Sequence, residues 1–579
     1  MRTNSRTATT RADYPGRAHP HRSGRLLAVA VTALTVAGLA VGTAGPAAAH
    51  PTPTPAAHQS GGSPHGRGWL PDAQLIPRSH FVMAPDGSSG ATQGGEGIPN
   101  IDSDKKTIYA YYGDPGTGIA DKSTSPYISE MKKIVAVQAA RLQRDYDRAK
   151  RRGEKPALVF DADDTTLWTY DMEVADMHFN FNPAEQDIWV QGQRFPATPA
   201  MVAFVNKAKK IGYTIFGLTG RNDNQKAATI ANLAKVGYDP NAFVAERFYT
   251  KWTGVAPSTQ PAYITCVATC TTVEYKAGTR AHIESLGYTI VANYGDQFSD
   301  LQGGHAQRAV KLPNPTYYLP SADLPGLNEP WLAPRTHFTM KADGSSGLTV
   351  GGEGIPNIDS VKKTIYTYYG DPGTGISDKT ASPYITELAK LAHKYQNRLV
   401  AQCRIESRFG GKPAIVFDTD DTTLWTYDME VAAMHFNFDP VLQDVWVQEK
   451  KFPATPSMVA LVNAVDAAGC QVVGLTGRND DQKDATIANL KDVGYNPFEA
   501  NFFFTKWTGE GTSQQPSYIT CAAAKCTTIE YKSQTRKYVE SKAFGRYHII
   551  ANFGDQYSDL IGGHSQRSIK LPNPTYYLP

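Results

Sequence analysis

One long segment occurs twice in the sequence, and this duplication limits the folds that the chain can adopt. Residues 78–103 read RSHFVMAPDGSSGATQGGEGIPNIDS, and residues 335–360 read RTHFTMKADGSSGLTVGGEGIPNIDS. The offset is 257 positions (335 − 78), and the same offset relates Asp161 to Asp418. Solenoid repeats have periods of roughly 20–50 residues. A period this long therefore indicates two complete domains in tandem.

The domain boundaries follow from where the two copies begin and end. Both copies close on KLPNPTYYLP, at 311–320 and 570–579. Between the copies lies the segment SADLPGLNEPWL, whose Pro and Gly content is typical of a linker. We therefore place the first domain at 76–320, the linker at 321–332 and the second domain at 333–579.

Residues 1–49 have the pattern of a secretory signal. A basic lead precedes the 16-residue apolar stretch Leu26–Val41, and Ala47–Ala49 fits a small-residue cleavage site. The alternative is an uncleaved membrane anchor, but a membrane span needs about 20 apolar residues. We expect a secreted, extracellular protein with no membrane contact after cleavage. Residues 50–75, rich in Pro, His and Gly, are expected to form a disordered spacer.

The charge balance argues against two classes of partner. The chain of 579 residues has a net charge of only +3, with 20% charged residues. A chain so near neutrality does not favour nucleic acid or a membrane surface through bulk electrostatics.

The cysteines fit an exported protein. Cys266 and Cys270 lie in the loop YITCVATCTT, and Cys521 and Cys526 lie in the matching loop of the second copy. An oxidising compartment favours a disulfide that closes each loop. Zinc would need two further soft ligands, and none is close in sequence. The two remaining cysteines occur only in the second copy and are Cys403 and Cys470. They either pair with each other or are buried thiols.

Each copy alternates apolar runs that suit buried strands with amphipathic runs that suit helices. The first copy is expected to contain, in order, a helix at about 125–150, a strand that ends at Asp161, a helix that begins near Met201, a strand at 213–221, a helix at 224–236, a helix near 276–286 and a strand at 288–296. This alternation predicts an α/β fold with a Rossmann-type parallel sheet flanked by helices. No large insertion follows the first strand, so we expect a small cap and an open site.

Acidic residues stand at the ends of the first and last of these strands. The first strand runs into LVFDADDTTLW at 158–168 and into IVFDTDDTTLW at 415–425. Unpaired buried carboxylates are costly, so these acids need partners. The carboxyl ends of parallel strands meet in one crevice, where open α/β sheets bind ligands. We therefore expect one cluster per copy, formed by Asp161, Asp163, Thr219, Lys276, Asp296 and Asp300 in the first copy and by Asp418, Asp420, Thr476, Lys532, Asp555 and Asp559 in the second.

The chemistry of this residue set points to phosphoryl transfer. Oxygen ligands select a hard cation, and Mg²⁺ takes one or two carboxylates together with substrate phosphate. Threonine and lysine suit phosphate oxygens. An aspartate held beside a cation can attack phosphorus, and a second aspartate two residues later can protonate the leaving oxygen and then activate water.

Four motifs of the sequence resemble those of the haloacid dehalogenase (HAD) superfamily. They are DxDDT after an apolar strand, LTGR, EYK…R, and GDQFSDLQGG…KLPNPTYYLP. The pattern is most similar to the secreted acid phosphatases of subfamily IIIB, which include plant acid phosphatases and vegetative storage proteins. The resemblance covers about 125–320 and 382–579. It implies two tandem HAD-like domains and a Mg²⁺-dependent acid phosphatase that acts on small phosphate monoesters.

The resemblance also implies a role for each residue of the two clusters. The implied nucleophiles are Asp161 and Asp418, and the implied general acid/bases are Asp163 and Asp420. The implied phosphoryl-binding residues are Thr219, Lys276, Thr476 and Lys532. The implied metal ligands are Asp161, Asp163, Asp296 and Asp300 in the first copy and Asp418, Asp420, Asp555 and Asp559 in the second. Some storage members of the family lack the nucleophilic aspartate, whereas both copies here keep it.

Several alternatives stay open at this point. Arg221 and Arg478 either touch substrate or cap a helix. The same aspartyl-phosphate chemistry serves a phosphotransferase or a nucleotidase, and a storage or surface-binding protein would use the duplication to raise avidity. If Asp163 donates a proton to the leaving group, the pH optimum is expected to be mildly acidic.

Overall fold

The computed structural model describes residues 80–83, 90–93, 100–266, 269–319, 337–340, 347–350 and 357–578. The predicted signal at 1–49, the spacer at 50–75 and the linker at 321–332 lie outside the described residues. We call residues 100–319 the first half and residues 357–578 the second half.

Each half is built on a five-stranded parallel sheet, which confirms the predicted fold class. The sheet of the first half has the order β5-β4-β3-β6-β7, with β3 (Lys155–Phe160), β4 (Thr214–Asn222), β5 (Phe248–Lys251), β6 (Tyr288–Gly295) and β7 (Ala309–Lys311). The sheet of the second half has the order β12-β11-β10-β13-β14, with β10 (Pro413–Phe417), β11 (Gln471–Asn479), β12 (Phe503–Lys506), β13 (His548–Gly554) and β14 (Ser568–Lys570). In both sheets the central strand has the next strand in sequence on one side and a later one on the other. Ligands bind at such switch points.

Helices connect the strands in both halves. Those of the first half are α1 (Ile101–Tyr112), α2 (Pro126–Ala139), α3 (Leu142–Arg151), η2 (Met172–Asp176), α4 (Pro183–Gln191), α5 (Met201–Ile211), η3 (Asp223–Gln225), α6 (Lys226–Lys235), η4 (Ala245–Arg247), α7 (Thr272–Ser285) and α8 (Phe298–Leu301). Those of the second half are α9 (Ile358–Tyr369), α10 (Pro383–Arg408), η6 (Met429–Ala433), α11 (Pro440–Gln448), α12 (Met458–Ala467), η7 (Asp480–Gln482), α13 (Lys483–Asp492), η8 (Ala500–Phe502), α14 (Thr528–Glu540) and α15 (Tyr557–Leu560).

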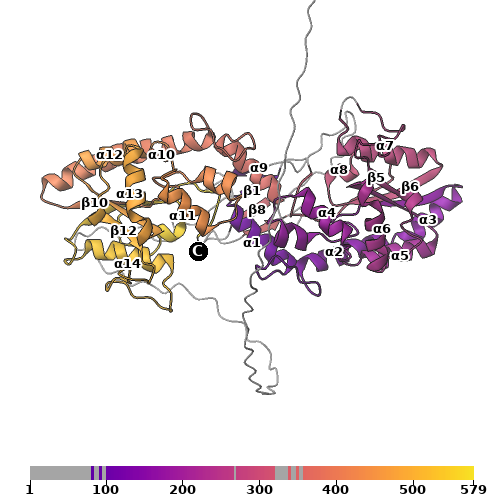
Figure 1. The fold of residues 1–579 in the computed structure, drawn as a ribbon, viewed down its shortest axis with the longest axis horizontal. Helices are drawn as coiled ribbons and strands as arrows, with labels where there is room; N and C mark the ends of the chain where they lie inside the picture. The colour runs from indigo at the N-terminus through magenta and orange to yellow at the C-terminus, as the bar shows by residue number, and fades with distance from the viewer. Residues whose placement is uncertain are drawn as a thin grey trace, which may run out of the picture. The chain divides into compact units, whose positions relative to one another are not determined.

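The helices cover both faces of each sheet. In the second half, α10 and α12 lie on one face and α14 lies on the other (Figure 1). The central strand of the first half shows why, because nearly every residue of KPALVF is buried. Leu158 and Phe160 face the core beneath α2 and α5, whereas Ala157 and Val159 face the core beneath α7. A strand buried on both sides is typical of a parallel sheet between two helical layers.

The predicted helix at about 125–150 is wrong as a single element. The first half has α2 and α3 there, with a break at Ala140 and Arg141. At the break the Arg141 N–H donates to the Gln138 carbonyl, three residues back instead of four. No Pro or Gly lies at this position. The second half has one continuous helix of 26 residues, α10, at the matching place.

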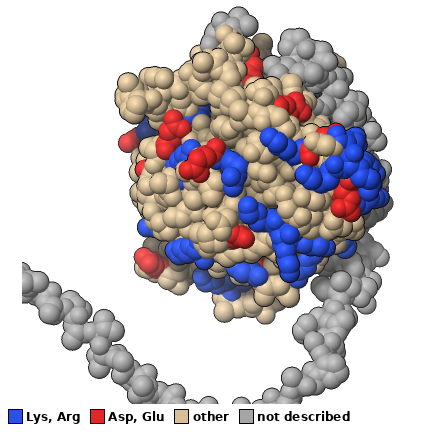
Figure 2. Space-filling model, turned by 90° about the vertical axis from the view of Figure 1, so that its right-hand side faces the viewer, with Lys and Arg blue, Asp and Glu red and all other residues tan. Residues whose placement is uncertain are grey.

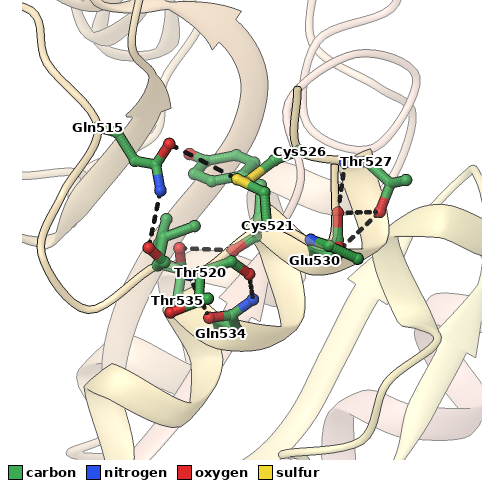
Figure 3. Close-up of a disulfide and its surroundings, with 11 residues drawn as sticks. Gln515, Thr520, Cys521, Cys526, Thr527, Glu530, Gln534 and Thr535 are labelled. Carbon is green, nitrogen blue, oxygen red and sulfur yellow. Dashed lines mark hydrogen bonds between the residues drawn. A yellow bond between two sulfur atoms is a disulfide. The ribbon is translucent and has the colours of Figure 1, made fainter. Parts of the chain in front are cut away.

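The predicted disulfides are present. Cys521 bonds Cys526 just before α14, where Thr527 caps the helix and Glu530 completes a capping box (Figure 3). Cys266 bonds Cys270 at the matching place before α7. Cys403 on α10 and Cys470 before β11 also bond each other, so these two residues are a disulfide pair and not buried thiols.

A third, smaller sheet joins the opening segments of the two copies. Its order is β2-β1-β8-β9, with β1 (His80–Met83), β2 (Gly90–Gln93), β8 (His337–Met340) and β9 (Gly347–Val350). The strands β1 and β8 pair antiparallel, with Phe81 opposite Phe338. Because these are equivalent residues of the two copies, the pairing relates the opening segments by a local two-fold rotation.

Basic side chains gather on one face of the molecule (Figure 2). The last turn of α3, which lies on that side in Figure 1, carries Arg148, Lys150 and Arg151. Cations in a last helical turn interact favourably with the helix dipole. None of the helices in the described ranges combines the length and the apolar character needed to cross a membrane.

Candidate active site

The first predicted cluster, which we call site 1, lies at the carboxyl ends of β3 and β6. Asp161 follows β3, Asp296 follows β6, and Asp300 lies on α8. One carboxylate oxygen from each lies within 4.8 Å of the others, and all three residues are buried. Gly295 permits this approach, because a Cβ atom there would lie 2.4 Å from the Cβ of Asp300. The neighbouring strands thus bring together acids that are far apart in sequence.

Lys276 is the counter-charge of the three acids. Its Nζ lies 2.7 Å from Oδ1 of Asp161 and 2.5 Å from Oδ1 of Asp300. The lysine lies on α7, whose N-terminus is fixed by a capping box between Thr271 and Glu274. The cap sets where the helix begins and therefore which side chains reach the end of the sheet.

Site 1 carries more negative charge than its lysine can balance. Burial raises the pKa of Asp161, although Lys276 opposes that effect. Burial and the charge of Asp300 raise the pKa of Asp296 to about 6, although hydrogen bonds from neighbouring amides oppose that shift. Burial lowers the pKa of Lys276, but the charges of Asp161 and Asp300 outweigh it and the net shift is upward. A cation at this position would relieve the repulsion among the acids.

Asp163 is not in the group of three acids, because Arg221 holds its carboxylate. Nη2 of Arg221 lies 2.5 Å from Oδ1 of Asp163, and Nε lies 3.1 Å from Oδ2. Nη1 donates to the hydroxyl of Thr229 at 2.9 Å. The arginine side chain is fully buried, so its position is fixed by these bonds. The arginine therefore contacts Asp163, the expected acid/base, and a threonine of α6.

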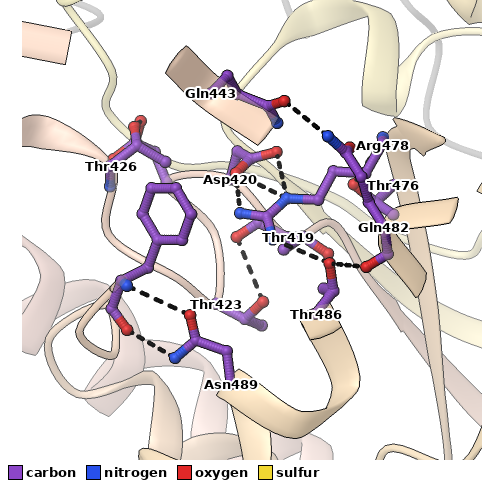
Figure 4. A network of polar contacts seen from close by, with 12 residues as sticks. Thr419, Asp420, Thr423, Thr426, Gln443, Thr476, Arg478, Gln482, Thr486 and Asn489 are labelled. Atoms are coloured by element: carbon purple, nitrogen blue, oxygen red, sulfur yellow. Dashed lines mark hydrogen bonds and ion pairs between the residues drawn. The ribbon is translucent and has the colours of Figure 1, made fainter. Parts of the chain in front are cut away.

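The second half repeats this arrangement. Figure 4 shows the Arg478 guanidinium between Asp420 and Thr486, with Nη2 2.6 Å from Oδ1 of Asp420 and Nη1 2.9 Å from Oγ1 of Thr486. Gln482 accepts a bond from Thr486 and donates to Gln443 on α11. This network of hydrogen bonds connects Asp420, the candidate acid/base, to α11.

Thr219 lies on β4, is fully buried, and contacts Arg221. Its Oγ1 accepts from the Arg221 N–H at 3.2 Å, and its carbonyl accepts from the Tyr275 hydroxyl at 3.2 Å. Tyr275 precedes Lys276 on α7, so this hydrogen bond connects Thr219 to the helix that carries Lys276.

Asn314 is a site residue that sequence reasoning did not assign. Its Nδ2 donates to Oδ2 of Asp296 at 2.8 Å and to Oδ2 of Asp164 at 3.2 Å. Burial and the charge of Asp296 raise the pKa of Asp164 to about 8, against hydrogen bonds from Thr169. Asn314 lies within the KLPNP motif that closes each copy, so the motif is the sequence signal for this residue.

Arg280 is a second unassigned residue. It is fully buried on α7, and its guanidinium donates to the carbonyls of Asp300, Gln302 and Gly304 at 2.6, 2.5 and 2.8 Å. Three bonds from one rigid fork fix the loop that presents Asp300.

The second cluster, site 2, has the same geometry. Nζ of Lys532 lies 2.5 Å from Oδ1 of Asp418 and 2.5 Å from Oδ1 of Asp559. The carboxylates of Asp418, Asp555 and Asp559 again form a buried group within 4.8 Å. Nδ2 of Asn573 donates to Asp555 at 2.8 Å. These acids and the lysine line a cavity of about 550 Å³.

The donor set fits a hard divalent cation. Each cluster offers three buried carboxylate oxygens and no nitrogen or sulfur ligand among the described residues. Oxygen ligands of this kind suit Mg²⁺, Mn²⁺ or Ca²⁺. The excess negative charge of each cluster also favours a bound cation.

Comparison with known proteins gives one family for both halves. The family model described as HAD superfamily, subfamily IIIB (Acid phosphatase), matches residues 120–320 and again residues 377–579. The chain is 38% identical over 171 residues to the stem 28 kDa glycoprotein of Glycine max and 32% identical over 177 residues to acid phosphatase 1 of Solanum lycopersicum. Each match covers 29% of this chain and 61% or 60% of the relative, so the chain spans about three fifths of the length of these curated relatives.

Solved structures of the class C acid phosphatase from Bacillus anthracis also match. The tungstate-bound structure is 20% identical, with 38% of this chain and 86% of that chain covered and a TM-score of 0.28. A second structure of that protein is 22% identical, with 38% and 87% covered and a TM-score of 0.27.

Proposed function

Because this chain belongs to subfamily IIIB of the HAD superfamily, the acid phosphatases, we propose that each half hydrolyses phosphate monoesters at its own cluster. One observation carries the proposal. A buried lysine Nζ lies 2.7 Å from the Asp161 carboxylate within a group of three acids, and Lys532 and Asp418 repeat the arrangement at 2.5 Å. A buried nucleophile beside a cationic group is what attack on a phosphate ester requires.

Asp161 is the proposed nucleophile of site 1. Its Oδ atom attacks phosphorus, the bond from phosphorus to the ester oxygen breaks, and that oxygen takes a proton from Asp163. Water then attacks the aspartyl-phosphate and gives its proton to the Asp163 carboxylate. Phosphate leaves, and both aspartates return to their starting states. Asp418 and Asp420 have these roles at site 2.

Thr219 and Lys276 are the proposed phosphoryl-binding groups. The ammonium of Lys276 already bridges Asp161 and Asp300, so it stands where the transferred group would carry its charge. Such a preorganised cation in a buried site stabilises developing charge without reorganisation. Thr476 and Lys532 are the equivalent pair at site 2.

A magnesium ion is the proposed cofactor of each site. At site 1 the carboxylates of Asp161, Asp296 and Asp300 and the backbone carbonyl of Asp163 would hold it. When bound, the ion neutralises phosphate charge and orients the ester. Asn314 keeps Asp296 in place through a hydrogen bond of 2.8 Å. Asp418, Asp420, Asp555 and Asp559 would hold the ion of site 2.

The size of the site supports small or varied monoesters as substrates. The cap over site 2 consists of η6, α11 and their loops, and the cavity beneath it has a volume of about 550 Å³. A cavity of this size holds a small ester, since ligand pockets have volumes of roughly 300–1,000 Å³.

We also propose that the protein is exported from the cytoplasm. All six cysteines of the sequence form disulfides, in three pairs. Disulfides persist in oxidising compartments and are rare in the cytosol. The signal pattern at 1–49 agrees with this proposal.

The direct experiment is hydrolysis of an aryl phosphate by the full chain. Activity is expected at mildly acidic pH, it should be lost with a chelator, and added Mg²⁺ should restore it. Activity that is unaffected by the chelator would contradict the metal-assisted mechanism. Absence of hydrolysis in the presence of Mg²⁺ would favour the alternative function, a storage or binding protein.

A further inference from the structure

The opening helix of each half contacts the other half. The Ile101 N–H at the start of α1 donates to the Pro574 carbonyl at 2.8 Å, and Nδ2 of Asn100 donates to the Asn573 carbonyl at 3.1 Å. Lys106 Nζ lies 4.4 Å from the ring centroid of Tyr577. The closing PNPTYYL segment of the second half is thus anchored on the first half.

The reciprocal contacts are present as well. The Ile358 N–H at the start of α9 donates to the Pro315 carbonyl at 2.9 Å, and Nδ2 of Asn357 donates to the Asn314 carbonyl at 3.0 Å. Lys363 Nζ lies 4.6 Å from the ring centroid of Tyr318. Equivalent residues make equivalent bonds in both directions, as in an isologous dimer interface within one chain.

The anchored segment leads directly to the metal-site acids. Asn573, whose carbonyl is held by Asn100, uses its own Nδ2 to hold Asp555 at 2.8 Å and Asp421 at 3.3 Å. Two hydrogen bonds therefore connect the first half to an acid of site 2. Asn357, Asn314 and Asp296 form the same connection from the second half to site 1.

A carboxylate of the first half also lies in the wall of site 2. Asp102 lines the cavity that contains Asp418, Asp420 and Lys532. Its Oδ2 accepts from the Tyr577 N–H at 3.1 Å, and its side chain keeps 27% of its surface exposed. Asp102 can therefore still contact a molecule in the cavity while it holds the rim. Asp359 accepts from the Tyr318 N–H at 3.0 Å in the equivalent position.

The cap loops meet the other half in the same way. Lys105 donates to the Phe436 carbonyl and, at 3.1 Å, to Oδ1 of Asn437, both in the loop between η6 and α11. Nδ2 of Asn437 donates in turn to the His178 carbonyl in the cap loop of the first half at 3.2 Å. The helix that supplies Asp102 thus also positions the cap of site 2.

We propose that each active site is completed by the opposite half, with Asp102 a substrate-contacting residue at the mouth of site 2 and Asp359 its counterpart at site 1. The inference rests on the proposed function for its chemistry. It gives the duplication a physical reason, since one copy alone would lack this carboxylate in the lining of its cavity.

The test reads one site at a time in the full chain. Asp161→Asn leaves site 2 as the working site, and Asp418→Asn leaves site 1. In the first background Asp102→Asn is expected to raise KM for an ester whose leaving group carries hydroxyl donors, such as glycerol phosphate, about threefold to tenfold, because a hydrogen bond to a charged acceptor becomes one to a neutral acceptor. The change in kcat should be smaller. In the second background Asp359→Asn should do the same. Asp147→Asn on α3 is the matched control, because that acid is bonded only to Gln143 of its own helix among the described contacts.

The result depends on which site responds to each change. A KM increase from Asp102→Asn that is larger with site 2 working than with site 1 working supports the proposal. An increase that follows the residue's own half, or no increase in either background, overturns it. If the unmodified chain hydrolyses no phosphate ester, the proposed phosphatase function itself is refuted.

A second measurement does not depend on activity. Asp102→Ala removes the acceptor of the Tyr577 amide, so hydrogen exchange of that amide should rise about tenfold or more while the Tyr318 amide stays protected. Asp359→Ala should have the reverse effect. Unchanged exchange at both amides would show that the halves do not hold each other's closing segments.

Discussion

The guanidinium of Arg221 forms a bidentate ion pair with the carboxylate of Asp163, with Nη2 2.5 Å from Oδ1 and Nε 3.1 Å from Oδ2. The pair recurs as Arg478 and Asp420. Because the arginine is buried and also bonded to a threonine on the following helix, it fixes where the acid/base can stand. A two-point contact of this kind sets both position and orientation.

Replacing this arginine should impair chemistry more than binding. In the Asp418→Asn background, Arg221→Lys is expected to lower kcat about 100-fold, the usual cost of a misplaced catalytic group, with a smaller change in KM. Lysine keeps the charge but cannot form the two-point contact. Steady-state kinetics measures the effect, and Arg148→Gln on the exposed face of α3 is the control. A kcat within twofold of the background value would refute the positioning role.

Removing the buried lysine should destabilise the protein. Lys276→Met leaves Asp161 and Asp300 buried without their counter-charge, and loss of one partner of a buried ion pair costs about 3–5 kcal/mol. The melting temperature in chelator should fall, and hydrolysis at site 1 should be lost. Lys207→Met, an exposed lysine on α5, is the matched control. Equal melting temperatures for the two variants would contradict the assignment.

The metal-free protein should lose stability as pH rises. Burial raises the pKa of Asp296 and Asp555 to about 6 and that of Asp164 and Asp421 to about 8. The folded state then binds protons that the unfolded state releases above about pH 4, so the free energy of unfolding falls between about pH 4 and pH 8. Mg²⁺ would replace those protons.

The measurement is the melting temperature with chelator and with excess Mg²⁺ at about pH 5 and about pH 8, where this linkage differs most. The gain from Mg²⁺ should be larger at the higher pH. Asp296→Asn with Asp555→Asn should reduce this difference. A gain that is larger at the lower pH would contradict the charge balance described for the two clusters.

The disulfide between Cys403 and Cys470 should stabilise the second half selectively. It joins α10 to the start of β11 across a separation of 67 residues, and closing a loop of that length is worth about 4 kcal/mol in the chain-entropy account. Replacing both cysteines with Ala should therefore speed thermal inactivation of site 2, measured in the Asp161→Asn background. Site 1, measured in the Asp418→Asn background, serves as the reference. Equal inactivation rates with and without the bond would contradict this expectation.

The strands and the placement of the acids were predictable because they rest on local patterns. An apolar run followed by Asp161, and another followed by Asp296, needed only the rule that parallel strands end at one edge of a sheet. The repeat at an offset of 257 then applied the same reasoning to the second copy.

The residues that hold the acids were not predictable in the same way. The contacts of Arg221 with Asp163 and of Asn314 with Asp296 join segments that are distant in sequence, and no spacing rule reveals them. The helix α1 was also not foreseen, because its Gly- and Pro-rich approach is typical of a loop. Its cap, Asn100, and its first-turn acid, Asp102, contact the other copy, which a single-domain interpretation cannot show.

The most direct measurement compares three variants of the full chain, Asp161→Asn, Asp418→Asn and the two changes together, in hydrolysis of an aryl phosphate with Mg²⁺ at mildly acidic pH. Each single change is expected to remove the share of turnover that belongs to its own half. The double change should lower turnover about a thousandfold or more, because both nucleophiles are gone. Turnover that persists in the double variant would show that these two aspartates do not attack the phosphate ester.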